Sequence, residues 1–274
     1  MENSFLEEYR QKSLRSAQLK MLDILVAVDK ICKTHQITYW IEGGTLLGAM
    51  RHGGFIPWDD DLDISMMRSD YDRFIELAQK ELPATMFLQT RATDPLTVFR
   101  ACKVRDLNSY IADGDDNNSM KYQKGIFIDV FPYDVAPSKA RRLMGKVARA
   151  VCIADTALHK THCYSWHSVF ALFYFGLKRP LCRMVWNVAK SLTANGHYLA
   201  IDPYFSWCRA IHPKENIFPL TEIEFEGRLF PAPARSADYL ATLYGDWKQV
   251  PPKEKQQIHS MIIVPQLINQ PAEQ

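Results

Sequence analysis

The stretch 39–65, YWIEGGTLLGAMRHGGFIPWDDDLDIS, decides the interpretation of this chain, because glycines and carboxylates are concentrated in it. It contains five of the twelve glycines and four closely spaced aspartates, Asp59, Asp60, Asp61 and Asp63. Carboxylates this close repel one another, and a hard divalent cation such as Mg²⁺ between them relieves that repulsion. The stretch therefore indicates a metal site.

A glycine pair, Gly43 and Gly44, follows the apolar segment 37–42 and precedes a predicted helix over residues 45–51. Glycines between a strand and a helix start let backbone N–H groups approach a phosphate at the positive end of the helix dipole. We therefore expect a phosphate site next to the metal site. The combination is typical of nucleotide chemistry.

The whole chain is long enough, at 274 residues, for one large domain or for a core domain with a helical elaboration. Its net charge of +2 argues against a nucleic-acid partner. The N-terminus is acidic and polar and lacks the features of a signal peptide, so we expect a cytoplasmic protein. The six cysteines include no C-x-x-C pair, which argues against a disulfide framework or a thiolate zinc site.

Two strands are predicted to carry carboxylates. The alternation over residues 59–65 places Asp59, Asp61 and Asp63 on one face of a strand. Asp129 interrupts a later apolar strand over residues 125–132. There it is either a strand-end residue hydrogen-bonded to a loop or a further metal ligand, since an unpaired charge on an apolar face is costly.

Helical periodicity and capping signals outline the helices near these strands. An apolar stripe predicts a helix over residues 6–35, which we expect to pack across the sheet. Ser69 is expected to cap the helix after the carboxylate strand, with Asp72 as its capping-box partner. In the C-terminal part, Ser236 is the expected N-cap of a helix that ends at Gly245.

The segment 139–190 differs from the rest in charge, with ten basic residues and the single acid Asp155. Within it, the apolar and aromatic run 166–177 is too short to cross a bilayer, which takes roughly 20 residues. The run is either a buried core helix or part of a basic helical surface that lies on anionic lipid. The second interpretation predicts peripheral contact with the inner face of the cytoplasmic membrane.

The three motifs together, Gly-Gly after one strand, D-x-D on the next and a lone aspartate in a later strand, resemble the nucleotidyltransferase fold. We therefore expect an α/β (α+β) fold with a mixed sheet, flanking helices and a helical insertion. The expected organisation is a core with the metal and nucleotide site over residues 1–134, a basic helical insertion over 135–218, and a segment over 219–274 that completes the core.

Longer matches narrow the resemblance to one family. GGTLLGAMRHGGFIPWDDDLDI, KVRD at 103–106, IDVFPYD at 128–134, FEGRLFPAP at 225–233 and DYLATLYGDW at 238–247 resemble the LicD/fukutin-type phosphotransferases. Members of that family move a phospho-alcohol group from a CDP-activated donor to a glycan and release CMP. The resemblance implies transfer of phosphocholine from CDP-choline, or of a related group, to lipopolysaccharide or another cell-surface glycan. It also implies Mg²⁺ as cofactor, with Mn²⁺ as the alternative.

The resemblance also implies roles for individual residues. The expected metal carboxylates are Asp59, Asp61, Asp63 and Asp129. The residues expected to line or neutralise the nucleotide phosphates are Gly43, Gly44, Thr45, Lys103 and Arg105.

The remaining assignments stay open from the sequence. The base for the acceptor hydroxyl is one of the cluster carboxylates or His52, which is equally suited to a turn. Arg51 is a candidate phosphate contact or an ordinary surface arginine at a helix end. The alternative functions are an NTP-dependent nucleotidyltransferase acting on a small molecule or protein, and a non-catalytic adaptor at a lipid surface.

Overall fold

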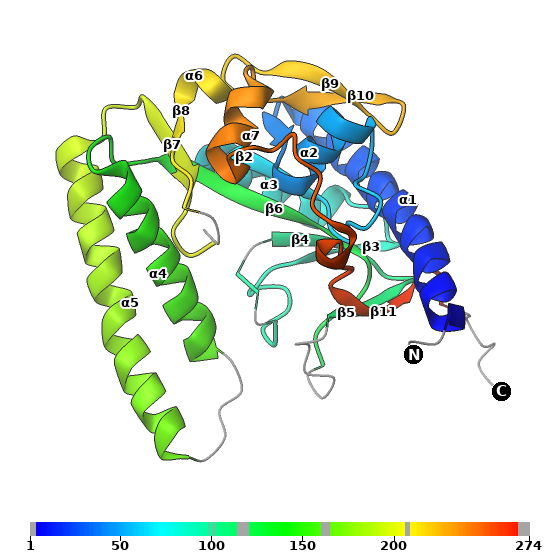
Figure 1. Cartoon of the computed structure of the whole chain (residues 1–274), viewed down its shortest axis with the longest axis horizontal. Coiled ribbons are helices and arrows are strands. Elements are labelled where there is room, and N and C mark those ends of the chain that lie inside the picture. The colour runs from blue at the N-terminus through cyan, green and yellow to red at the C-terminus, as the bar shows by residue number, and fades with distance from the viewer. Residues whose placement is uncertain are drawn as a thin grey trace.

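A mixed sheet lies at the centre of the computed structural model, which describes residues 4–97, 99–100, 102–113, 121–159, 165–205 and 209–267 (Figure 1). Its strands are β1 (Tyr39–Ile41), β2 (Asp63–Met67), β3 (Met86–Gln89), β4 (Cys102–Asp106), β6 (Phe127–Val135), β7 (Tyr198–Ile201) and β8 (His212–Pro213). The order is β1-β2-β6-β4-β3, and β7 pairs with both β6 and β8. Of the described pairs in this sheet, β2 and β6 run parallel and the others antiparallel.

Two strand pairs and the helices complete the architecture, and the predicted mixed α/β fold is confirmed. The outlying pairs are β5 (Tyr110–Asp113) with β11 (Ser260–Val264), and β9 (Thr221–Phe225) with β10 (Arg228–Ala232). The helices are α1 (Ser4–His35), α2 (Gly43–His52), α3 (Arg68–Glu81), α4 (Arg141–His159), α5 (Trp166–Thr193), α6 (Lys214–Ile217), α7 (Ser236–Tyr244) and the 3₁₀ turn η1 (Lys253–Lys255). None of the helices in the described ranges combines the length and apolar character that a membrane crossing requires.

The sheet separates an apolar face from a polar one. Ile64, Val104 and Val130 are fully buried on the face that packs against α1 and α3. Side chains alternate along a strand, so their neighbours in sequence project to the opposite face. An ion pair between Lys20 of α1 and Asp106 of β4, 3.2 Å long, fixes α1 on the apolar side. The face with Asp63 and Asp129 therefore lies away from α1.

The segment 135–218 contains two strands of the sheet as well as helices. α4 and α5 pack against each other as a hairpin that projects from the sheet (Figure 1). The same segment contains β7 and β8, and β7 pairs with the last residues of β6. The nine residues of β6 are long enough to pair with β4 along the first half and with β7 along the second.

The carboxylate strand is shorter than the alternation predicts. β2 begins at Asp63, and residues 59–62 form a loop, so the prediction of a strand from Asp59 was wrong. The backbone of that loop bonds elsewhere: Asp59 N–H donates to Ile56 O, and Gln18 Nε2 of α1 donates to Asp59 O at 2.9 Å. Only Leu62, the last residue of the loop, bonds to the sheet, because its carbonyl oxygen accepts a hydrogen bond from Asp129 N–H of β6 at 2.8 Å.

Both predicted serine caps were wrong. α3 begins at Arg68 directly after β2, which leaves Ser69 inside the first turn, and Met67 at the N-cap makes no side-chain bond to the helix. Ser236 is likewise the first residue of α7, and its hydroxyl donates to Pro233 O at 2.9 Å. The predicted stop at Gly245 is confirmed, with a φ of 71° that favours glycine.

The loop between α2 and β2 is held from two sides. Glu226, in the turn between β9 and β10, accepts two hydrogen bonds from Arg15 of α1, at 3.0 and 2.7 Å, and a third from Phe55 N–H at 3.0 Å. Gly48 of α2 packs directly under the loop, because a Cβ there would lie 2.4 Å from Gly54 O. This close packing fixes the path of the loop that precedes Asp59.

We predict that Gly48→Ala lowers the free energy of unfolding by about 1–3 kcal/mol, because the added methyl group meets backbone that has no room to shift. Gly176→Ala is the matched control: Gly176 is also inside a helix, and nothing lies within 4 Å of its Cβ position. That variant should gain up to about 1 kcal/mol from helix propensity. Urea unfolding measures both, and equal responses would contradict the packing described for Gly48.

Candidate active site

Three ionisable side chains form a row across the sheet. Asp63 on β2 lies opposite Asp129 on β6, which lies opposite Lys103 on β4. Residues opposite one another on neighbouring strands project to the same face. Lys103 Nζ is 2.8 Å from Asp129 Oδ2. The sheet thus assembles the row from three separate parts of the sequence.

The start of α2 lies against two of the carboxylates. A Cβ on Gly44 would lie 2.8 Å from Asp59 Oδ2, and one on Gly43 would lie 3.2 Å from Asp63 Oδ2. Gly43 also has a φ of 55°, in the region that favours glycine. The glycine pair is therefore required for the close approach of α2 to the carboxylates. The positive end of the helix dipole also favours negative charge there.

Crowding and burial act together on the aspartates. Burial, and next the charge of Asp61, raises the pKa of Asp59 to about 9. Burial, followed by the charges of Asp60 and Asp129, raises the pKa of Asp61 to about 6. Burial, followed by the charges of Asp61 and Asp129, raises the pKa of Asp63 well above its usual value. The cluster therefore favours protonation or a bound cation over four bare charges.

Lys103 is the buried cation of the row. Burial lowers the pKa of its ammonium group, while the charge of Asp129 acts in the opposite direction. The Nζ atom lies 3.5 Å from the centre of the Phe127 ring, a cation–π contact that partly replaces water. Asp129 Oδ2 is paired with Lys103, but Asp129 Oδ1 is buried and has no hydrogen-bond partner in the described part of the chain.

These residues have the donor chemistry that a hard divalent cation selects. Carboxylate oxygens are its preferred ligands, and the buried, unpartnered Asp129 Oδ1 is available to one. As the side chains lie, however, no three His, Cys, Asp or Glu side chains in the described ranges are grouped so that they could hold a metal ion. The metal assignment of Asp59, Asp61, Asp63 and Asp129 thus stays a prediction.

Other predicted site residues lie outside the carboxylate row. Thr45 Oγ1 accepts a hydrogen bond from Asp63 N–H at 2.8 Å and so connects α2 to β2. Arg105 is buried and donates to Gln89 Oε1 and to Gly125 O, both at 2.6 Å, which is a structural role.

Arg51 and His52 occupy the last turn of α2, roughly 12 Å along the helix axis from Gly43. Arg51 Nε and Nη1 are buried and have no described hydrogen-bond partner. His52 is exposed, and its ring makes an edge contact with Trp58, with 6.4 Å between the ring centres. Burial, and then Arg51, lowers the pKa of His52. The described contacts do not connect His52 with the carboxylate row.

Glu42 and Tyr244 are two residues that sequence reasoning missed. Glu42 is buried immediately before Gly43, and its Oε1 accepts hydrogen bonds from the hydroxyls of Tyr133 and Tyr239 at 2.9 and 2.8 Å. Burial raises the pKa of Glu42 to about 7 against the lowering effect of these bonds. The sequence did contain a signal for Glu42, because a carboxylate at the end of an apolar strand and directly before the glycine pair is a candidate site residue.

Tyr244 joins the carboxylate group from α7. Its hydroxyl lies 3.7 Å from the Cβ position of Gly43. Desolvation around the hydroxyl group, and then the charges of Asp63 and Asp59, raise its pKa, although the residue as a whole is 48% exposed. No sequence feature pointed to it, because a tyrosine near a helix end is equally typical of ordinary packing.

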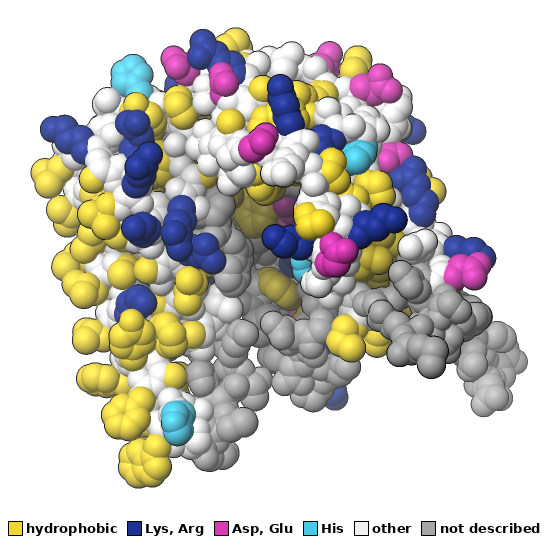
Figure 2. Space-filling view, viewed as in Figure 1, with side chains coloured by type: hydrophobic (Ala, Val, Ile, Leu, Met, Phe, Trp, Pro, Cys, Tyr) yellow, Lys and Arg dark blue, Asp and Glu magenta, His cyan; other side chains and the backbone are white. Residues whose placement is uncertain are grey.

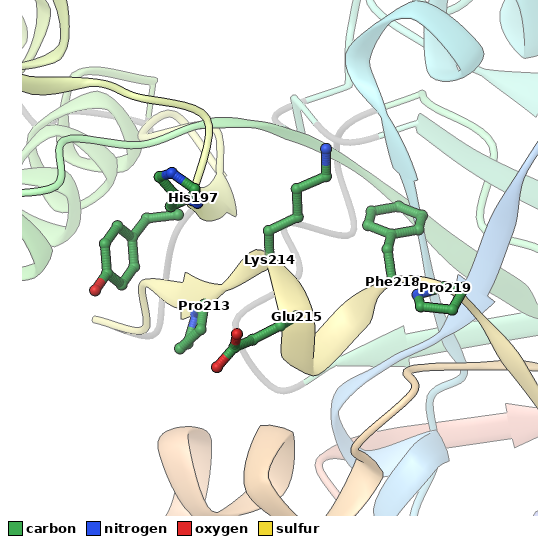
Figure 3. Close-up of a pocket in the computed structure, with 7 residues that line it drawn as sticks. His197, Pro213, Lys214, Glu215, Phe218 and Pro219 are labelled. Carbon is green, nitrogen blue, oxygen red and sulfur yellow. The ribbon is translucent and has the colours of Figure 1, made fainter.

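A separate pocket of about 610 Å³ opens between β7, β8 and α6 (Figure 3). Its lining combines Tyr198 and Phe218 with the charged Lys214 and Glu215, which point in different directions in Figure 3. Phe218 also packs edge-on against Trp40 of β1, with 5.6 Å between the ring centres. The aspartates of the row are not among its lining residues.

The carboxylate cluster should make stability depend on pH in the metal-free protein. The folded pKa values of Asp59 and Asp61 exceed the unfolded value of about 3.9. At pH values between the unfolded and the folded pKa, the native state therefore binds more protons than the unfolded state. The free energy of unfolding therefore falls as pH rises, by up to about 1.4 kcal/mol per pH unit for each group, between about 4 and 9 for Asp59 and between about 4 and 6 for Asp61. Thermal unfolding in a chelator across this range tests the slope.

Asp59→Asn should flatten that slope and raise the melting temperature near the upper end of the range, because it removes a half-buried charge from the cluster. Asp23→Asn is the matched control, since Asp23 is exposed on α1. Identical pH profiles for Asp59→Asn and the wild type would show that the carboxylates do not repel one another as described.

The chain matches a protein family and several known proteins. The family model described as LicD/FKTN/FKRP, nucleotidyltransferase domain, matches residues 36–167. The chain is 30% identical to the lipopolysaccharide cholinephosphotransferase LicD of Haemophilus influenzae over 91% of its own length and 97% of that protein. An uncharacterised protein of Rickettsia typhi is 38% identical over 26% of each chain, and the mouse ribitol 5-phosphate transferase FKRP is 56% identical over 12% of this chain and 7% of its own length. The chain belongs to the LicD family.

Proposed function

We propose that this protein transfers phosphocholine, or a related phospho-alcohol group, from a CDP-linked donor to lipopolysaccharide or another cell-surface glycan. The observation that carries the proposal is the cluster of Asp59, Asp61, Asp63 and Asp129 against the glycine start of α2, in a member of the LicD family. The relative that matches nearly the full chain is a lipopolysaccharide cholinephosphotransferase, and the mouse relative is a ribitol 5-phosphate transferase. Both names describe transfer of an alcohol phosphate.

The chemistry requires positioning and charge neutralisation more than a protein nucleophile. Mg²⁺, held by Asp61, Asp63 and Asp129 with Asp59 beside them, would neutralise the donor pyrophosphate and make CMP a better leaving group. The backbone N–H groups that precede the first intrahelical bond of α2, Leu46 N–H to Glu42 O, are oriented for phosphate oxygens.

The acceptor hydroxyl must lose its proton to a base near the donor phosphate. A cluster carboxylate fits this role better than His52, because His52 is exposed in the last turn of α2. Lys103, against Asp129, supplies fixed positive charge on the same face.

We predict that Asp61→Asn and Asp63→Asn each reduce CMP release from CDP-choline by at least ~100-fold, since each removes a charge from the metal site and no volume from the core. Mg²⁺ should raise the melting temperature of the wild type by binding the native state, and should have little effect on either variant. Asp23→Asn serves as the control for both measurements. Turnover near the wild-type rate in either variant at saturating Mg²⁺ would refute the proposed site.

The donor class is tested separately with labelled phosphorus. With CDP-choline labelled in the phosphate next to choline, the label should appear in the glycan product, and unlabelled CMP should be released. An NTP-dependent nucleotidyltransferase would instead transfer the α-phosphate of a nucleoside triphosphate to its product. Incorporation of α-phosphate label from CTP or ATP, together with inactivity on CDP-alcohols, would show that the nucleotidyltransferase alternative is correct.

A further inference from the structure

One face of α5 packs against α4, and the opposite face is not covered by any described part of the chain. A small cluster of buried residues connects the hairpin to the sheet, and it contains Met144 and Ala148 of α4. Of the 28 residues of α5, all within the described ranges, Trp186 alone is buried. The hairpin projects from the sheet, and the first residues of α5 form its distal end (Figure 1). The outward face of α5 is therefore open along the whole helix.

That open face is apolar and aromatic. The large exposed side chains along α5 repeat every three or four residues, so they form one stripe on a helix. The residues of the stripe are Trp166, Phe170, Phe173, Leu177, Leu181, Met184, Val188 and Leu192. Trp166 is 79% exposed and Phe173 is 74% exposed. A continuous stripe of this kind on a monomer marks an interaction surface, and Figure 2 shows hydrophobic side chains along the outer edge and distal end of the hairpin.

The charge of the hairpin restricts what can cover the stripe. α4 and α5 together have eight basic residues and one acid, while the whole chain has a net charge of only +2. The one acid, Asp155, is buried and paired with Arg100 and Arg179. Lys and Arg side chains lie beside the hydrophobic edge in Figure 2. The hairpin therefore offers a basic and apolar surface without an exposed carboxylate.

Several basic residues remain available for an anionic partner. Arg183 and Lys190 of α5 are paired with Asp202 and Asp134, both at 3.1 Å. In the described part of the chain, no carboxylate forms an ion pair with the following five: Arg141, Arg142, Lys146, Arg149 and Lys178. Arg142 and Lys146 are exposed one turn apart on α4.

We propose that the hairpin lies in the interface of an anionic lipid bilayer, with the apolar stripe of α5 inserted among the headgroups and acyl chains and the basic residues facing anionic headgroups. Aromatic and aliphatic side chains on one face, with lysine and arginine around them, are characteristic of helices that lie in this interface. A second copy fits less well, because two such hairpins would bring positive surfaces together without carboxylates to pair with them.

Vesicle binding tests the proposal without any substrate, so it is independent of the reaction proposed above. The wild-type chain should sediment with vesicles that contain phosphatidylcholine and phosphatidylglycerol at low salt, bind pure phosphatidylcholine more weakly, and be released by high salt. Phe170→Ser with Phe173→Ser should weaken binding at least ~10-fold, because it removes two inserted rings. Both side chains are mostly exposed, so the fold should not change.

Arg142→Glu with Lys146→Glu should weaken binding to the anionic vesicles at least ~10-fold and leave the weak binding to phosphatidylcholine unchanged. The matched controls are Leu229→Ser with Met261→Ser for exposed apolar residues, and Lys253→Glu with Lys255→Glu for charge. Both controls should bind like the wild type.

Two results would overturn the proposal. In the first, the wild type remains in the supernatant with anionic vesicles at low salt. In the second, the hairpin variants and the controls bind equally well. If the wild type instead forms dimers that the Phe170 and Phe173 substitutions dissociate, and does not bind vesicles, a second copy covers the stripe.

Discussion

Repulsion among four aspartates is the constraint on which the rest of the structure depends. Asp59, Asp61, Asp63 and Asp129 are brought together although burial and mutual proximity raise the pKa values of the first three. The surrounding fold must supply the free energy to hold them there. The parallel pairing of β2 with β6 places Asp63 opposite Asp129. Lys103, on the other side of Asp129, offsets part of the negative charge.

The loop that carries Asp59 and Asp61 is held by contacts from distant parts of the chain. Gln18 of α1 donates to backbone carbonyls of the loop, and the neighbouring Asp60 accepts a hydrogen bond from Ser260 N–H of β11 at 2.6 Å. Asp60 is thus a structural carboxylate, although it lies between two candidate ligands. Glycines contribute in two ways: Gly43 and Gly44 allow the carboxylates to reach α2, whereas Gly48 allows the loop to pack on it.

The sequence was sufficient to predict the strand that carries Asp129 and the glycine-led helix, because each depends on local periodicity or local backbone freedom. The mixed fold was predicted from the resemblance of the motifs to the nucleotidyltransferase fold. Sequence reasoning misjudged residues 59–62, whose alternation is that of a strand, because the backbone of Asp59 bonds to a turn and to α1. The environment of Arg105 was equally hard to foresee. Its residue type suggested a phosphate contact, and its Nε and Nη1 donate to Gln89 and Gly125 on other segments. Such outcomes depend on tertiary neighbours that local patterns do not contain.

The same strands that carry the aspartates also reach the helical hairpin. β6 carries Asp129 near its start and Asp134 near its end, and Asp134 is paired with Lys190 of α5 at 3.1 Å. β2 carries Asp63 at its start and is followed by Arg68, which bonds to Asp202 at 3.1 Å, the carboxylate that also pairs with Arg183 of α5.

These partly buried pairs connect rigid strands to α5, and burial makes such pairs sensitive to loss of one partner. The orientation of the hairpin is therefore set by β2 and β6, the two strands that also set the positions of Asp63 and Asp129. A surface that binds the outer face of α5 consequently has a defined orientation relative to the aspartate row.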